Sequence, residues 1–417
     1  MRRASVVALG MALLAATACT SASDIAPPIR IGAIYPLSGT QGPGGVDEFQ
    51  GVQLAVQLAN AAGGLNGRRI ELVPIDVPSG DAAPEAIARL DAEGIRLVLG
   101  SYGSTISAPA AVEATARGLL FWETGAVGEM GGDGPGRLVF RVAPSGAVLG
   151  RSAIAFIADQ YAPLIGEDPA NLRFAITLVD DAYGRAVAQG AIDELEERGL
   201  TIAGQFPYDP RHVDMIDLVR RLGASHPDVL FASAYLDDAI EMRREMVDQG
   251  VDVLAGIGTS SSYCMPAFGE RLGEDAVGLF ASDKPDSDAL DIRGLTPDGR
   301  ALLERAQLAY RERFGGTMSA AALAGFSGAW ALLHEVLPKA GELTPAAIAD
   351  AALWVDLPEG SLPNGSGLKF GAPGTVTAGA NVRAESVIWQ WTDPSVHWVV
   401  WPERYATYPI EAIDPLP

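Results

Sequence analysis

The strongest constraint on the fold is a regular alternation of short apolar runs and longer amphipathic segments from residue 29 onward. Residues 29–37, IRIGAIYPL, form a short apolar run that ends near a proline, which is typical of a buried strand. Apolar residues then recur at helical spacing over residues 52–59, and Gly63 and Gly64 end that pattern. This repeated order predicts an α/β fold in which crossover helices cover parallel sheets on both faces.

The alternation contains more strand–helix units than one sheet would hold. A chain of 417 residues is long enough for two domains with sizeable cores. We therefore expect two lobes, with a break within residues 140–148, FRVAPSGAV. Ligands of open α/β sheets bind beyond the carboxyl ends of the strands. The loops expected around such a crevice are 40–47, 101–107, 124–130, 180–183, 235–237 and 256–263.

The first residues have the pattern of an export signal. Arg2 and Arg3 precede an apolar run over residues 6–18, which has the length of a secretory core and is too short to span a membrane. AATAC, ending at Cys19, resembles the lipobox of bacterial lipoproteins. We expect a signal peptide over residues 1–18, lipidation of Cys19 and a tether over 19–28. The alternative is an ordinary signal peptide cleaved near Ala18 or Ala22.

Charge and motifs exclude several functions. The 30 basic and 52 acidic residues give a net charge of −22, which would repel a phosphate backbone and argues against nucleic acid as a partner. No GxSxG, HExxH or Walker A motif occurs, and the 4 histidines are too scattered to form a metal cluster. We expect neither an enzyme nor a bound cofactor. If Cys19 is lipidated, Cys264 has no disulfide partner and should be a small buried side chain.

Hydroxyl side chains are concentrated where residues 96–100 end and an alanine-rich helix is expected. They belong to Ser101, Ser104, Thr105 and Ser107. Capping a helix needs only one such side chain, whereas the amides and hydroxyls of a helix N-terminus can also bind an anion. The spacing of these residues is compatible with both interpretations, a helix cap and a ligand-binding position.

Two tyrosines stand at corresponding strand ends. In DDAYG, residues 180–184, Asp181 is placed to cap a helix and Tyr183 lies in its first turn. Tyr235 follows the apolar run at residues 228–234 in the same way. An aromatic ring with a hydroxyl suits a small polar ligand.

With these features assembled, the chain resembles the type I periplasmic solute-binding proteins, in the leucine/isoleucine/valine-binding branch. The resemblance runs from residue 29 to about 391 and is carried by IRIGAIYPLSG, GGLNGRRIEL and VDDAYGRA. It implies a two-lobed clamp in which each lobe is a parallel sheet flanked by helices and three hinge crossings join the lobes. The implied bounds are 29–143 with 284–358 for the first lobe, and 144–283 with 359–417 for the second.

The resemblance also implies roles for residues. Ser104 matches the position that binds an amino acid carboxylate, with Thr105 beside it, and Thr124 matches a position that contacts the ligand through its backbone. Tyr183 and Tyr235 match the two tyrosines of the second lobe.

At two further positions the chain differs from the residue that is usual in the family. Ala126 stands where a threonine is usual, and Gly258 stands where an acidic side chain pairs with the ligand ammonium. Glu123 is the first candidate to replace that acid, although it could equally be a solvated residue at a strand end. Asp181 and Asp237 are weaker candidates.

Other side chains could shape the same pocket. Ser260 and Tyr263 follow a strand at the crevice, and Trp122 lies near it or in the core. The cargo is therefore expected to be a branched-chain or related amino acid, an amide or urea-like solute, or a small carboxylate.

The implied setting is the cell envelope, either in the periplasm or at the outer face of the cytoplasmic membrane. The partners would be an ABC permease and its ATPase subunits. The alternative function is a sensor that uses the same clamp without transport.

Overall fold

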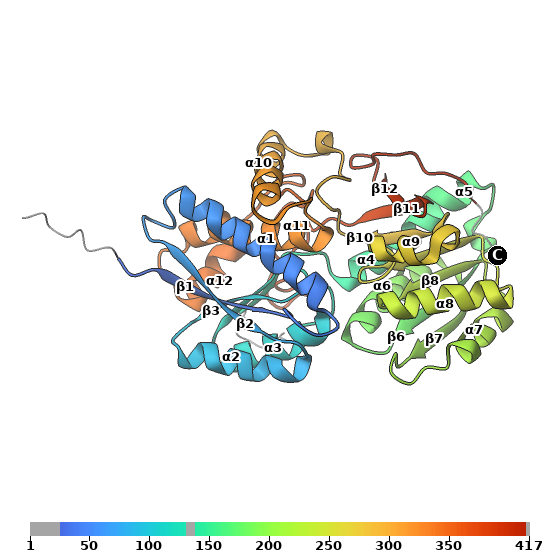
Figure 1. Ribbon diagram of the computed structural model, residues 1–417, viewed down its shortest axis with the longest axis horizontal. Helices are drawn as coiled ribbons and strands as arrows, with labels where there is room; N and C mark the ends of the chain where they lie inside the picture. The colour runs from blue at the N-terminus through green and yellow to red at the C-terminus, as the bar shows by residue number, and fades with distance from the viewer. Residues whose placement is uncertain (1–25, 131–137, 414–417) are drawn as a thin grey trace, which may run out of the picture.

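The computed structural model describes residues 26–130 and 138–413. Two lobes lie side by side along the longest axis of the molecule (Figure 1). We call the five-stranded sheet with its helices the first lobe, and the seven-stranded sheet with its helices the second lobe. The predicted signal peptide and Cys19 lie outside the described residues.

The first lobe is built on an all-parallel sheet with the strand order β2-β1-β3-β4-β5. The inner strands of this sheet are buried on both faces by helices, which explains their apolar runs, whereas the edge strand β2 keeps several accessible residues. The strands are β1 (Ile29–Tyr35), β2 (Ile70–Asp76), β3 (Leu97–Gly100), β4 (Leu120–Glu123) and β5 (Val139–Arg141). The helices are α1 (Gly42–Ala61), α2 (Ala83–Ala92), α3 (Ser104–Ala116), α10 (Pro297–Phe314), α11 (Ala320–Trp330) and α12 (Pro345–Leu353).

The second lobe has the strand order β12-β11-β10-β9-β8-β6-β7. Its strands are β6 (Arg173–Val179), β7 (Thr201–Tyr208), β8 (Val229–Ser233), β9 (Ala255–Thr259), β10 (Phe280–Asp283), β11 (Val387–Asp393) and β12 (Val396–Trp401). Its helices are α4 (Gly146–Phe156), α5 (Ala162–Leu164), α6 (Ala182–Arg198), α7 (Met215–Ala224), α8 (Leu236–Gln249) and α9 (Pro266–Leu272).

The predicted α/β class with two helix-covered sheets is confirmed. The strand alternation did not foresee one feature, because β11 pairs with β10 and β12 in antiparallel orientation. Antiparallel neighbours need only a short turn, here at residues 394–395, and therefore lack the crossover helix that marks the other strands.

The chain passes between the lobes at places that its contacts define. It leaves the first sheet after Arg141 and enters α4 at Gly146, and β10 ends at Asp283 before the chain returns. Later in the chain, the Asn381 amide donates to the Arg141 carbonyl over 2.9 Å, at the edge strand β5. We therefore propose that the third crossing lies between residues 381 and 387, later than the position near 358 expected from the sequence.

Helix α11 is a core element that packs directly on α1. Gly51 allows this approach, since a Cβ there would lie 1.9 Å from the Ala322 carbonyl oxygen. A Cβ at Gly325 would lie 2.1 Å from the Glu48 carbonyl oxygen. Among the described residues, Ala320–Lys339 is the one helical segment long and apolar enough to cross a membrane, but it is mostly buried inside the protein. This packing fixes Glu48, on α1, in the buried interior of the first lobe.

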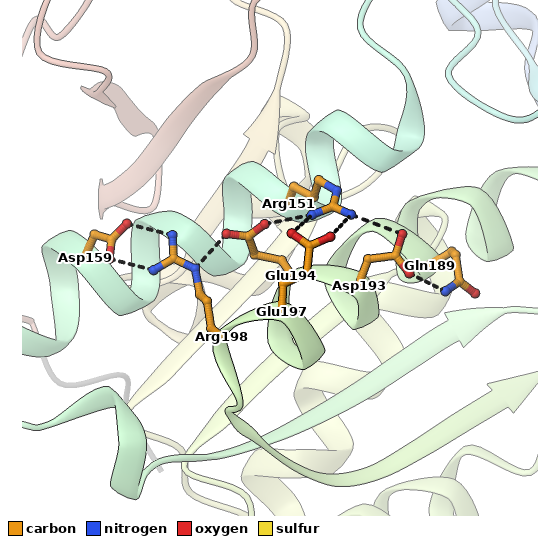
Figure 2. Close-up of polar contacts among 7 residues, drawn as sticks. All are labelled: Arg151, Asp159, Gln189, Asp193, Glu194, Glu197 and Arg198. Carbon is orange, nitrogen blue, oxygen red and sulfur yellow. Dashed lines mark hydrogen bonds and ion pairs between the residues drawn. The ribbon is translucent and has the colours of Figure 1, made fainter. Parts of the chain in front are cut away.

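In the second lobe, charged side chains connect α4 and the helical turn that follows it to α6 (Figure 2). Arg151 donates to Glu194 and Glu197 at 3.0 and 2.8 Å, and Arg198 donates to both oxygens of Asp159. The partners remain accessible to solvent, so this network contributes modestly to stability.

Candidate functional site

A cavity of about 260 Å³ lies between the lobes, at the carboxyl ends of the parallel strands of both sheets. Each of the six loops expected at a crevice contributes to its lining. From these loops the lining residues are Gln41, Pro43, Gly44, Asp47, Tyr102, Gly103, Ser104, Gly125, Val127, Tyr183, Tyr235, Ser260 and Ser261. The carboxyl-end rule therefore located the cavity from the sequence.

Ser104 lines the cavity at the first turn of α3, and Thr105 does not. The Ser104 hydroxyl accepts a hydrogen bond from the Gly128 amide at 2.9 Å, which leaves its own proton available to a ligand. The amides of the first turn of a helix have no acceptor within the helix, so this position suits an anion. The Thr105 hydroxyl accepts from the Gln41 side chain at 3.2 Å and supports the loop after β1.

The other two serines hold Glu123, at the end of β4, and their hydroxyls bond to each other at 2.6 Å. The Ser101 amide and the Ser107 hydroxyl donate to one carboxylate oxygen of Glu123. The Gly125 and Ala126 amides donate to the other oxygen at 2.8 and 2.7 Å. Glu123 is fully buried, and its carboxylate ties the loop after β3 to the loop after β4. Burial raises the pKa of Glu123, and these four donors oppose that rise.

Glu123 is absent from the cavity lining, and so is Thr124. The Thr124 hydroxyl donates to Glu48 at 2.6 Å and bonds with the Tyr35 hydroxyl at 2.8 Å. Glu48 is fully buried directly behind Gly125, where a Cβ would lie 1.8 Å from a Glu48 carboxyl oxygen. Burial raises the pKa of Glu48 well above its ordinary value, and the nearby charge of Glu123 raises it further. Two buried acids thus lie behind the cavity lining, and burial raises the pKa of both.

Ala126 and Gly258 also lie outside the lining. Ala126 is buried in the first-lobe core, while its neighbours Gly125 and Val127 face the cavity. A Cβ at Gly258 would lie 2.1 Å from a ring carbon of Tyr263. Since the Tyr263 ring fills the space that a side chain would need, no carboxylate can occupy position 258 in this packing.

Both predicted tyrosines line the cavity from the second lobe. Their rings lie 5.5 Å apart. The Tyr183 hydroxyl bonds with the Thr259 hydroxyl at 2.8 Å and donates to the Ser260 carbonyl oxygen. The Tyr235 hydroxyl donates to Asp181 at 2.6 Å. This wall is therefore a pair of fixed aromatic rings whose hydroxyls are already engaged within the protein.

The remaining predicted residues have structural contacts. Asp181 caps α6 by accepting from the Tyr183 and Gly184 amides at 2.9 Å. Asp237 is exposed and pairs with Arg271 at 2.6 Å. Trp122 is fully buried, and its indole nitrogen donates to the Gly328 carbonyl at 2.9 Å. Tyr263 is likewise buried and lies outside the lining.

The sequence analysis missed an ion pair at the second crossing. Asp283 and Lys284 line the cavity and pair at 3.0 Å, with side chains only 4% and 7% exposed. Burial lowers the pKa of Lys284, but its attraction to Asp283 outweighs this effect and leaves that pKa raised. The Cys264 thiol, also in the lining, donates to Asp283 at 2.9 Å. Because Asp283 ends β10, the carboxyl-end rule could have indicated this pair.

Two further carboxylates in the lining have no cationic partner among the described residues. Asp47 accepts from the Ser319 hydroxyl at 2.8 Å, and one oxygen of Asp286 accepts from the amides of residues 288 and 289. Burial raises the pKa of Asp286. The side-chain oxygen of Gln41 is also buried and lacks a partner among the described residues. These acceptors give the first-lobe side of the cavity an excess of negative character.

The lobes meet across the cavity at Tyr102 and Ser261. Both adopt left-handed backbone conformations, with φ of 95° and 74°, which are uncommon for residues other than glycine. Burial raises the pKa of the Tyr102 hydroxyl, and its interaction with the Ser261 side chain partly offsets that rise. Such backbone strain is often retained where a loop must present a side chain to a ligand.

No group of three or more histidine, cysteine or acidic side chains within residues 26–130 and 138–413 could hold a metal ion. The cavity instead combines an anion-binding position at Ser104, two aromatic rings and carboxylates that have no cationic partner among the described residues. That arrangement can enclose a small solute with both a negative and a positive end.

Known proteins resemble this chain over most of its length. The sequence profile of the periplasmic binding proteins matches residues 28–376. The Leu/Ile/Val-binding protein homolog 8 of Brucella suis biovar 1 is 29% identical over 97% of this chain and 98% of its own length. Homolog 7 of Brucella melitensis biotype 1 is 28% identical over 93% of this chain and 94% of its own length.

Solved structures share the fold. LivJ, a branched-chain amino acid transporter substrate-binding protein from Streptococcus pneumoniae solved with isoleucine, aligns with a TM-score of 0.70 and 17% identity, covering 90% of this chain and all of that one. An ABC transporter substrate-binding protein from Desulfitobacterium hafniense in complex with Leu aligns with a TM-score of 0.65 and 25% identity, covering 88% of this chain and 98% of that one.

Proposed function

Because the chain belongs to the periplasmic binding protein family, we propose that it captures a small solute between its lobes and delivers that solute to an ABC importer. The family and the relatives are binding proteins of the Leu/Ile/Val type, so the chain is a solute-binding protein and not an enzyme, as the sequence predicted. The finer parts of the proposal are the ligand, the residues that hold it, the permease and the lipid anchor.

The observation that carries the proposal is the position of Ser104. Ser104 lines the cavity at the start of α3, its hydroxyl proton is not used by the Gly128 contact, and Tyr183 and Tyr235 line the same cavity from the second lobe. We assign the carboxylate end of the solute to Ser104 and its hydrocarbon part to the space beside the rings. Three of the predicted residues then support the loops that line the cavity and do not contact the solute: Thr105, Thr124 and Ala126.

Other acidic side chains of this cavity can pair with the ligand ammonium in place of a carboxylate at position 258. Asp47 and Asp286 line it without a cationic partner among the described residues, and the Gln41 oxygen adds an acceptor. We assign the ligand ammonium to this side in place of Glu123, whose carboxylate already accepts four hydrogen bonds. An α-amino acid would thus place its two charged ends on separate groups of the first lobe.

Calorimetric titration with leucine, isoleucine and valine tests the assignment. Hydrogen bonds to charged groups are worth about 1.5–3 kcal/mol, so Asp286→Asn should weaken binding by tenfold or more. Asp288→Asn is the matched control, because Asp288 is exposed two residues away and outside the lining. Equal affinities for the two variants would remove Asp286 from the site.

A melting experiment tests solute binding itself. A true ligand at 100 times its dissociation constant adds about 2.7 kcal/mol to the free energy of unfolding. If no amino acid, amide, urea or small carboxylate raised the melting temperature of the mature chain, the proposal would fail.

Anchoring and delivery need separate tests. Replacing Cys19 with alanine should move the protein from the membrane fraction to the soluble envelope fraction. Uptake of the identified solute should be lost when the chain is deleted and restored when it is returned, whereas a sensor would leave uptake unchanged.

A further inference from the structure

Two side chains at the second-lobe end of the cavity each have a buried ring nitrogen without a hydrogen-bond partner among the described residues. They are Trp389 on β11, through Nε1, and His397 on β12, through Nδ1. Trp389 is only 1% exposed. A buried indole N–H normally has an acceptor, as Trp122 and Trp391 do here at 2.9 and 2.7 Å. Both of these residues belong to the lining of the cavity, which is where a ligand could supply the missing partners.

The surroundings of these nitrogens are mostly apolar. Met265 and Pro266 also line the cavity, and the His397 ring lies 4.7 Å from the Trp389 ring and 4.4 Å from the Trp391 ring. Burial lowers the pKa of His397 to about 4, so its imidazole is neutral near pH 7. Two charged groups of the lining on this lobe's side, Asp283 and Lys284, are already paired with each other. This end of the cavity thus offers one donor and one neutral imidazole that can accept.

We propose that this end of the cavity is a subsite for a neutral carboxamide at the far end of the solute, with Trp389 Nε1 donating to its oxygen and His397 Nδ1 accepting from its nitrogen. The inference rests on the proposed function and specifies its ligand class. An aliphatic side chain would leave both ring nitrogens unpaired, which costs affinity. A carboxylate would place a buried charge beside neutral rings and the Asp283 carboxylate.

The test compares solutes that differ only in the distal group. Asparagine has nearly the shape of leucine, and glutamine that of homoleucine, with a carboxamide in place of the branched hydrocarbon end. Calorimetric titration of the mature chain should show at least a tenfold preference for the amide member of one pair. Each titration needs only the wild-type protein, so the result does not depend on a variant that folds.

Variants then locate the preference. Trp389→Phe and His397→Phe remove one ring nitrogen function each while keeping an aromatic ring, and each should reduce the amide preference at least fivefold. Trp330→Phe is the matched control, because this tryptophan also packs on a histidine, His334, but lies outside the cavity lining. Its preference should stay within twofold of wild type, with melting curves recorded for all three variants.

The outcomes are distinct. Equal affinity within both pairs, or tighter binding of the hydrocarbon members, would overturn the carboxamide subsite while leaving solute capture intact. An amide preference that survives in both Trp389→Phe and His397→Phe would also overturn it. Failure of all four solutes to bind would overturn the subsite, and failure of the wider solute panel as well would overturn the proposed function.

Discussion

Glu123 organises the first-lobe wall of the cavity, whereas Asp181 organises the second-lobe wall. Glu123 is fully buried and accepts from three backbone amides and the Ser107 hydroxyl, which come from two loops. Asp181 is partly accessible and accepts from two amides of its own helix and from the Tyr235 hydroxyl. All four donors to Glu123 lie in the core, whereas Asp181 combines a local helix cap with one hydrogen bond to a distant side chain.

This difference indicates how each wall should respond to change. A local cap can be lost with limited cost, because the helix is held by other contacts. A buried acceptor shared by four donors cannot, because its removal leaves three backbone amides in the protein interior without their acceptor. We therefore expect the first-lobe wall to depend on one side chain and the second-lobe wall to tolerate its loss.

The largest expected effect is that of Glu123→Ala. The substitution should lower the free energy of unfolding by about 3–5 kcal/mol, as for other broken buried polar networks, and should abolish solute binding through loss of the loop geometry. Urea denaturation with calorimetry measures both quantities. Glu113→Ala, which breaks only an exposed pair with Arg117, is the control. A loss below 1 kcal/mol for Glu123→Ala would contradict the comparison.

The second-largest expected effect is a change in how the free energy of unfolding depends on pH. The folded protein binds the Glu48 proton more tightly than the unfolded chain does, since burial raises that pKa above its ordinary value of 4.5. This contribution is complete below pH 4.5 and is lost as the pH rises through the folded pKa, at about 1.4 kcal/mol per pH unit. Glu48→Gln keeps an acceptor for Thr124 but cannot titrate. Its free energy of unfolding, measured in urea from pH 5 to 8, should fall less steeply than that of wild type; parallel curves would exclude Glu48.

Asp181→Ala should have a smaller effect on stability. Loss of the α6 cap is expected to cost about 1–2 kcal/mol, and the freed Tyr235 hydroxyl should weaken solute binding severalfold. Asp214→Ala is the matched control, since Asp214 caps α7 by accepting from the Asp217 amide at 3.1 Å and is absent from the cavity lining. The two variants should melt alike and differ in affinity. Equal affinities would show that Asp181 does not organise the wall.

Arg151→Ala should have the smallest effect. Its partners on α6 are accessible to solvent (Figure 2), so the loss should be about 1 kcal/mol or less and should shrink further in high salt. Solute affinity should not change, because the network lies outside the cavity lining. Thermal melts at low and high salt measure the effect, and a loss comparable to that of Glu123→Ala would reverse the comparison.

Local patterns predicted much of the site. The helix start at residues 180–184 identified Asp181 as a cap and Tyr183 as a first-turn residue, and both are so placed. The carboxyl-end rule selected loops that all reach the cavity. Such features depend on residues close together in the chain, and a sequence displays them directly.

Other parts of the site depend on packing that no local motif specifies. Nothing near Gly258 in the sequence indicates that the Tyr263 ring occupies its side-chain space. Trp389 and His397 reach the cavity only because an antiparallel pair joins β10 late in the chain. The register of such a pair follows from side-chain packing and is not written in a local motif.

The amino acid sequence by itself determined two helix-covered sheets and the edge at which a ligand would bind, because hydrophobic periodicity and strand direction are properties of neighbouring residues. Tertiary structure decided which side chains face the cavity and which support it, as Ser104 and Ser107 illustrate within one loop. The physical reason is that a polar side chain is assigned by the partners it meets after folding, and those partners, Gly128 for one and Glu123 for the other, come from elsewhere in the chain.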